Sequence, residues 1–134
     1  MNTRPIVKNW NYPNFKKSEM DCKCGCGINN SDEIFMDRLQ EARRHSTIPF
    51  IINSGCRCEK HNATVSKNPV SDHISNDILT TVGADIRARN DQERLIITNA
   101  LIKAGFRRIR YNFRLKYIHV ALTTRNPEGI GVDG

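Results

Sequence analysis

Two histidines and one aspartate in this chain have the residue types of a zinc site. His73 stands in a polar stretch, whereas Asp85 and His119 each stand inside a short apolar run, at residues 83–86 and 117–120. An ionisable side chain within a strand-like run needs a compensating partner, and a metal ion is one such partner. Two imidazoles and one carboxylate leave a fourth zinc position open for water, as catalytic zinc requires. The alternative is that each histidine is a packed or surface residue, which is common for a single histidine in a strand.

Two segments that would support these residues are predicted as α-helices. Asn30 opens the first with a capping box, and that helix runs to about residue 45. Asn90 opens the second in the same way, and Gly105 ends it. A shorter helical turn is expected at residues 59–65. The helices therefore alternate with the runs that carry the candidate ligands.

Short runs rich in apolar and β-branched residues predict four strands, at 49–54, 83–88, 106–111 and 115–122. A tight turn joins the last two into an antiparallel hairpin, and residues 66–82 form a long polar loop. The expected fold is α+β, with helices packed on one side of a small, mostly antiparallel sheet. Residues 1–134 are expected to form a single domain, with an N-terminal arm (1–20) and a loose C-terminal tail (123–134).

The charge balance points to an anionic partner. The net charge is +7, from 21 basic and 14 acidic residues, which suits nucleic acid, a membrane surface or an anionic cell-wall polymer. A solvated basic surface explains the charge equally well. No basic stripe interleaved with aromatic residues is present, which disfavours nucleic acid. Neither a long apolar run nor an apolar leader is present, so we expect synthesis in the cytoplasm and later release by another agent.

Five cysteines form two groups in the sequence, Cys22, Cys24 and Cys26 on one loop and Cys56 and Cys58 on another. An odd number cannot pair completely within one molecule, and a cytoplasmic origin argues against an obligatory disulfide framework. Three arrangements remain open: a second, structural zinc site built from four thiolates, one disulfide between the loops, or buried free thiols.

Four motifs in order carry a resemblance to a known family. They are Ser-Gly-Cys-Arg-Cys-Glu-Lys-His-Asn (54–62), Ser-Asp-His (71–73), Gly-Ala-Asp-Ile (83–86) and Ile-His-Val (118–120). This series resembles the zinc D-alanyl-D-alanine carboxypeptidases and related peptidoglycan endopeptidases, which share their fold with lysostaphin and the hedgehog signalling domain. The Cys-Lys-Cys-Gly-Cys-Gly loop is similar to that of small, often phage-encoded members. The resemblance covers roughly residues 10–122.

The resemblance implies a role for five residues. His73, Asp85 and His119 would be the zinc ligands, and Arg57 would face the substrate, because a planar fork of donors suits a peptide carboxylate or carbonyl. Ser71 would orient its loop or form a hydrogen bond near the metal and substrate. The cofactor implied is therefore Zn²⁺, and the implied partner is bacterial peptidoglycan, the substrate of a lysis-type enzyme. We expect the protein to be a monomer.

The chain departs from the family pattern in the spacing of its ligands. His73 and Asp85 are farther apart than in relatives, with the extra residues in 75–82. These residues either enlarge a loop and leave the ligands in place, or they disturb the site, in which case Asp77 becomes a competing ligand.

A second departure removes the general base that a metallopeptidase needs. Ala121 stands where the family has an aspartate, and Lys116 stands where many relatives have an acid. The nearest carboxylates in the sequence, Asp72, Asp77 and Glu59, match no family position. Two hypotheses follow: a zinc metallopeptidase that hydrolyses a peptide bond in peptidoglycan stem peptides, as D,D-carboxypeptidase or endopeptidase, or a catalytically impaired, zinc-stabilised binding module for cell wall or nucleic acid.

Overall fold

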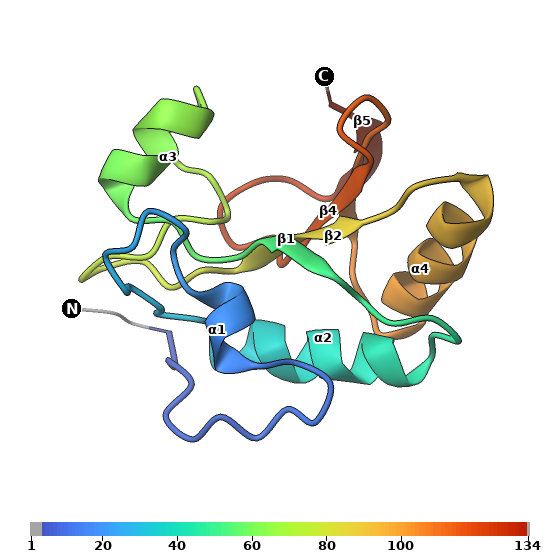
Figure 1. The fold of residues 1–134 in the computed structure, drawn as a ribbon, viewed down its shortest axis with the longest axis horizontal. Helices are drawn as coiled ribbons and strands as arrows, with labels where there is room; N and C mark the ends of the chain where they lie inside the picture. The colour runs from blue at the N-terminus through green and yellow to red at the C-terminus, as the bar shows by residue number, and fades with distance from the viewer. Residues whose placement is uncertain (1–3, 134) are drawn as a thin grey trace.

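A computed structural model describes residues 4–133 of the chain. At its centre lies a five-stranded sheet with the order β1-β2-β4-β3-β5 (Figure 1). Neighbouring strands are antiparallel, except that β5 lies parallel to β3. This confirms the predicted mostly antiparallel sheet, including the β3–β4 hairpin. The strands are β1 Ile52–Ser54, β2 Gly83–Arg87, β3 Arg108–Asn112, β4 Tyr117–Ala121 and β5 Gly129–Val132.

The two long helices, α2 and α4, pack together on one side of the sheet, as the α+β prediction requires (Figure 1). The short α3 lies on the other side of β1 from α2, near the loop that precedes β2. Among the described residues, no helix is long and apolar enough to cross a membrane. The helices are α1 Lys17–Met20, α2 Glu33–Arg44, α3 Glu59–Val65 and α4 Asp91–Lys103.

The first long helix begins two residues later than predicted. Its N-cap is Asp32, whose side chain accepts a hydrogen bond from the backbone N–H of Phe35 at 3.0 Å. Asn30 is instead part of an extended segment, because its carbonyl accepts from the N–H of Thr81 and the N–H of Asp32 donates back to the Thr81 carbonyl. An extended segment paired in this way cannot join the helix. The predicted Asn90 cap of α4 is confirmed.

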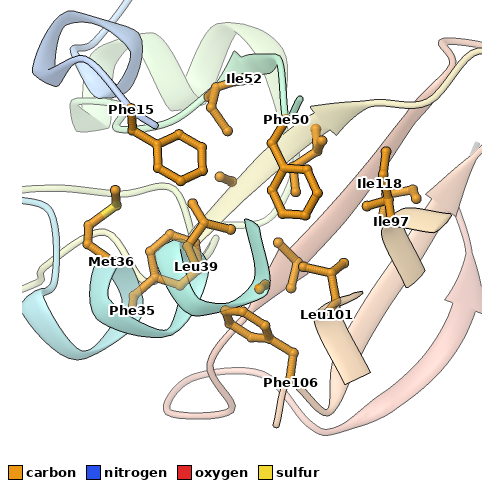
Figure 2. Packing of buried hydrophobic residues seen from close by; sticks show 14 of the residues in the cluster. Phe15, Phe35, Met36, Leu39, Phe50, Ile52, Ile97, Leu101, Phe106 and Ile118 are labelled. Atoms are coloured by element: carbon orange, nitrogen blue, oxygen red, sulfur yellow. The ribbon is translucent and has the colours of Figure 1, made fainter. Parts of the chain in front are cut away.

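Alternation along β2 and β4 separates an apolar face of the sheet from a polar face. Ile86 and Ile118 are fully buried in the core, whereas Asp85 and His119, their neighbours in the chain, point to the opposite face. Burial of each large apolar side chain contributes roughly 1.5–3 kcal/mol. A slip of one residue would exchange the two faces, so the core sets the position of the polar residues. The helices contribute the apolar side chains that meet this face in Figure 2, among them Phe35, Met36, Leu39, Ile97 and Leu101.

The C-terminal segment corrects the prediction of a loose tail. Residues 129–132 form β5, which extends the sheet beside β3. Gly131 lies beside the guanidinium of Arg110, because a Cβ at that position would lie 2.7 Å from its Nη1. That guanidinium donates from its Nε to Asp133 at 2.7 Å. Residues 1–3 of the predicted arm and Gly134 of the predicted tail lie outside the described residues.

Candidate active site

The three predicted metal ligands meet on the polar face of the sheet. Asp85 of β2 and His119 of β4 are directly opposite each other in the antiparallel register, and His73 reaches them from the loop before β2. All three are buried, and one ligand atom of each lies within 4.8 Å of the others. The structure therefore brings together residues that are separated by as many as 46 positions in the chain, from 73 to 119.

The ring of His73 is oriented by the segment that follows β1. Its Nδ1 lies 2.7 Å from the carbonyl oxygen of Gly55, which can only accept, so Nδ1 carries the proton. The other ring nitrogen, Nε2, faces Oδ1 of Asp85 at 3.2 Å. A backbone carbonyl that fixes the tautomer in this way is a regular partner of metal-binding histidines.

The ring of His119 is oriented by Asp72. Its Nε2–H donates to Oδ2 of Asp72 at 2.7 Å, and its Nδ1 faces Oδ1 of Asp85 at 2.8 Å. Asp72 is held by two further donors, Arg108 at 2.9 Å and Asn126 at 2.9 Å. Asp72 was one of three carboxylates that the sequence suggested for proton transfer. In the structure, the carboxylate of Asp72 accepts these three hydrogen bonds, and one of them orients the ring of His119.

These contacts shift the pKa values of the buried groups. Burial alone would raise the pKa of Asp72, but hydrogen bonds, first of all from His119, lower it to about 2. Burial alone would lower the pKa of His119, but hydrogen bonds to Asp72 and Asp85 raise it to about 9. Burial likewise opposes ionisation of Asp85, yet the two histidines keep its pKa well below the usual range. The raised pKa of His119 favours protonation of its ring beside the two carboxylates.

The donor set fits a zinc ion. Nε2 of His73, a carboxylate oxygen of Asp85 and Nδ1 of His119 converge, and each can offer a lone pair once His119 releases its proton. A tetrahedral zinc with bonds of about 2.0–2.1 Å separates its ligands by roughly 3.3 Å. The 3.2 Å and 2.8 Å contacts to Asp85 are close to that separation. A zinc ion between these three side chains would balance the negative charge of the buried Asp85 carboxylate, which the imidazole of His119 balances in the absence of metal.

The extra residues between His73 and Asp85 form a turn, and both side chains still converge with that of His119. The hydroxyls of Ser75 and Thr81 lie 2.6 Å apart and close the base of this turn. Thr81 also donates to the carbonyl of His73 at 2.8 Å. Asp77, at the tip, is exposed and belongs to neither metal-competent group of the described residues. Competition by Asp77, which the sequence left open, has no support in this geometry.

A cleft of about 270 Å³ opens over the three residues. Arg57 lines it from the turn after β1, with its Nη2 3.6 Å from Oδ2 of Asp85 and its Nε bonded to the hydroxyl of Ser54 at 3.2 Å. Ser71 also lines the cleft, and its hydroxyl accepts from the backbone N–H of His73 at 3.2 Å. This contact lies within the loop that carries His73, and the two roles predicted for Ser71 stay predictions.

The cleft is also lined by residues that sequence reasoning did not assign. Tyr117 lies two positions before His119 on the same face of β4, and Arg110 is paired with His119 across β3 and β4. Burial, with a smaller contribution from the charge of Asp85, raises the pKa of the Tyr117 phenol, which therefore stays protonated at neutral pH. Asp133 reaches the cleft from the end of β5. The sequence contains one local feature near these residues, the basic cluster Arg-Arg-Ile-Arg at 107–110.

The segment before β5 holds the loop that carries His73. Arg125 donates to the backbone carbonyls of Ser71 at 2.7 Å and Ile74 at 3.3 Å, and also to that of Thr80. Ser71 and Thr80 lie at the beginning and the end of the part of the loop that contains His73. No sequence signal predicted this contact, because it joins positions 45 to 54 residues apart.

Ala121, which stands where the family pattern has an aspartate, lies near the carboxylate of Asp72. Ala121 and Asp72 both flank Gly83, where a Cβ would lie 3.0 Å from the Cβ of Ala121 and 2.8 Å from that of Asp72. A carboxylate is thus present beside the last histidine, although it comes from the Ser-Asp-His motif and not from the strand. Glu59, the third carboxylate considered from the sequence, lies on α3 and does not line this cleft.

The five cysteines separate into two environments. Cys22, Cys24, Cys26 and Cys58 form a second group of side chains that is able to hold a metal ion. Cys56 is fully buried in the core and stands apart from that group. The described residues contain no disulfide, and all five thiols are free.

The chain matches the model of a known protein family. A family model described as Peptidase M15 matches residues 13–121. The chain belongs to the Peptidase M15 family. This confirms the resemblance seen in the motifs, and M15 peptidases are metal-dependent. No curated protein and no solved structure matches the chain. The matched range of residues contains His73, Asp85 and His119.

The contact between Asp72 and His119 leads to a prediction for metal affinity. Asp72→Asn would keep the shape of the side chain but weaken the acceptor that fixes the proton on Nε2 of His119. We expect the affinity of this site for zinc to fall about 10–100-fold, as measured by competition with a metal-sensitive dye. Asp91→Asn, which changes an exposed carboxylate of α4, should leave the affinity unchanged. Equal affinities in the two variants would contradict the positioning role.

Proposed function

We propose that this chain is a zinc metallopeptidase that hydrolyses a peptide bond in the stem peptides of bacterial peptidoglycan, as a D,D-carboxypeptidase or an endopeptidase. The observation that carries the proposal is the convergence of His73, Asp85 and His119 at the floor of a polar cleft in an M15 chain. The net charge of +7 favours approach to an anionic cell wall.

The metal would be held by Nε2 of His73, a carboxylate oxygen of Asp85 and Nδ1 of His119. Bound zinc would lower the pKa of a coordinated water to roughly 7 and polarise the carbonyl of the substrate. Gly55 and Asp72 would keep the two imidazoles in the required tautomers. The residues around the cleft would bind the peptide and move its protons.

Arg57 and Tyr117 are placed to bind the oxygen atoms of the substrate. The side chain of Arg57 is 13% exposed and lines the cleft, where Ser54 and Asp85 restrict its position. Its remaining N–H groups would donate to a peptide carbonyl or a terminal carboxylate. The protonated Tyr117 phenol, which also lines the cleft, would donate a further hydrogen bond.

Asp133 is the best candidate for the group that accepts the proton of the attacking water. Three carboxylates line the cleft within the described residues: Asp72, Asp85 and Asp133. Asp85 would be a metal ligand, and Asp72 is occupied by His119. Asp133 has its single side-chain ion pair with Arg110 and is 41% exposed, so water and substrate can reach it. It would later return the proton to the leaving amine.

The alternative is a zinc-stabilised module that binds cell wall without cleaving it. Ala121 and Lys116 favour this alternative, because they replace acids of the family pattern. The structure adds that Lys116 adopts a positive φ of 59° in the β3–β4 turn, a conformation that serves the turn. The two functions predict the same metal content but a different effect on peptidoglycan.

The proposal is tested by zinc content and hydrolysis in the wild type and in His119→Ala. We expect the variant to hold one zinc fewer per chain and to lose cleavage of purified peptidoglycan and of a stem pentapeptide ending in D-Ala-D-Ala. His45→Ala, which removes an exposed histidine at the end of α2, is the matched control and should behave as the wild type. Loss of one zinc with a wild type that never cleaves would support the binding module. Unchanged zinc in His119→Ala would refute the metal site.

A further inference from the structure

A second cluster of metal-ligating side chains lies outside the cleft. It joins the loop before α2 to the turn that begins α3, and its members are Cys22, Cys24, Cys26 and Cys58. Their sulfur atoms all lie within 4.8 Å of one another. We infer that these four cysteines form a structural zinc site that fixes the loop at 22–28 against the segment that carries Arg57.

The distances between the sulfur atoms are those of a tetrahedral metal site. Cys24 Sγ lies 3.5 Å from Cys22 Sγ and 3.7 Å from Cys58 Sγ. Zinc–sulfur bonds of about 2.3 Å place the corners of a tetrahedron roughly 3.8 Å apart. A disulfide would bring two sulfurs to about 2.05 Å. One thiol group, Cys24, is close to two others at once, which a single disulfide does not explain but a shared cation does.

Backbone N–H groups point at two of the sulfurs. The N–H of Cys58 lies 3.4 Å from Sγ of Cys22, and the N–H of His61 lies 3.3 Å from Sγ of Cys58. The second contact makes Cys58 the N-cap of α3. Donors of this kind stabilise the negative charge of a thiolate, the form in which cysteine binds a metal.

The fifth cysteine is excluded from the site by its surroundings. Cys56 is fully buried, with its Sγ 3.5 Å from the hydroxyl of Ser31 and 3.4 Å from Oδ1 of Asn29. It therefore has polar partners of its own in the interior. The odd number of cysteines is accounted for as four ligands and one core residue.

The backbone holds the ligands in place independently of a metal. The N–H of Cys22 donates to the carbonyl of Ile28 at 3.0 Å, which closes the loop, and Gly25 takes a φ of +90° between two ligands. The N–H of Cys56 donates to the carbonyl of Met20 at 2.8 Å. Gly55 permits this approach, because a Cβ there would lie 2.7 Å from Met20. The two loops thus meet through the main chain at the position where the sulfurs cluster.

The site would support the cleft without taking part in chemistry. Four thiolates complete the coordination of zinc and leave no position for water or substrate. Cys58 directly follows Arg57, whose own backbone N–H and carbonyl bond to His73 and Ser75 at 2.7 and 2.8 Å. Zinc at the cysteines would therefore fix one wall of the substrate cleft by fixing the start of α3.

The test is the number of zinc ions per chain in protein purified with a reductant. We expect two in the wild type, one in Cys24→Ser, one in His119→Ala and none in the double variant. Cys24 is exposed, so its replacement leaves the core untouched. Cys56→Ala is the matched control and should retain both ions. After replacement of zinc by cobalt(II), the thiolate-to-metal charge-transfer band should be present in His119→Ala and absent in Cys24→Ser.

The outcomes separate this site from the one in the cleft. Two ions in Cys24→Ser, or one ion in the wild type that His119→Ala removes, would overturn the cysteine site and leave the proposed function standing. A disulfide involving Cys24 or Cys58 in protein prepared without reductant, found by mass spectrometry and unaffected by added zinc, would also overturn it. One ion that persists in His119→Ala and disappears in Cys24→Ser would establish the cysteine site and refute the metal site of the cleft.

Discussion

Asp85→Ala is expected to abolish zinc binding in the cleft and to reduce hydrolysis of peptidoglycan below detection. Asp85 contacts His73 at 3.2 Å, His119 at 2.8 Å and Arg57 at 3.6 Å. Its removal takes one proposed metal ligand away and leaves a largely buried guanidinium without its carboxylate. Because breaking a buried ion pair from one side is costly, we expect the free energy of unfolding to fall by about 3–5 kcal/mol.

The measurements are zinc content, cleavage of purified peptidoglycan and unfolding by urea. Asp85→Asn serves as a second variant, because it keeps the shape of the side chain while it loses the charge, and it should also lose the zinc. Asp77→Ala is the control, since Asp77 is an exposed aspartate of the loop before the same strand. An Asp85→Asn protein that folds and retains full zinc and activity would contradict the proposed site.

Asp133→Asn is expected to lower the rate of hydrolysis by about 10²–10⁴-fold while zinc content stays at the wild-type value. The amide keeps an oxygen that accepts from Arg110, as the carboxylate does at 2.7 Å, so β5 should remain in place. It cannot accept a proton from water at neutral pH. The decrease should therefore fall on kcat, with little change in KM.

Glu128→Gln is the matched control for this prediction. Glu128 belongs to the same C-terminal segment and pairs with Arg107, but it does not line the cleft. Its replacement should change neither zinc content nor rate. If Asp133→Asn cleaves peptidoglycan as fast as the wild type, the proton acceptor is another group, and Asp133 only anchors Arg110.

The sequence predicted the α+β fold and the family correctly because the signals for both are local. Apolar alternation at 83–86 and 117–120 sets the two central strands, and helix caps such as Asn90 act within one turn. The prediction that Asn30 caps the first long helix was wrong because of a contact with a distant segment of the chain. Its carbonyl pairs with Thr81, and no pattern around residue 30 contains that information.

The candidate site was predicted in part. His73, Asp85 and His119 could be selected by residue type and motif, and the structure brings them together, while their binding of zinc stays a prediction. The role of Asp72 in orienting the ring of His119 could not be predicted from residue type and motif. A carboxylate next to a ligand histidine has the same sequence signature whether it transfers protons or orients a ring, and only the 2.7 Å contact with His119 distinguishes the two.

By itself, the sequence determined three of the four helices and four of the five strands of the described residues, the sheet type, the family and the identity of the three metal-competent residues. These depend on side-chain types and on periodicities of a few residues, which are present before the chain folds. The tertiary structure alone decided that the predicted tail forms β5, that Asp133 and Arg125 reach the cleft and its ligand loop, and that four of five cysteines cluster. Each of these results is a contact between distant segments, and such contacts follow from how the whole core packs.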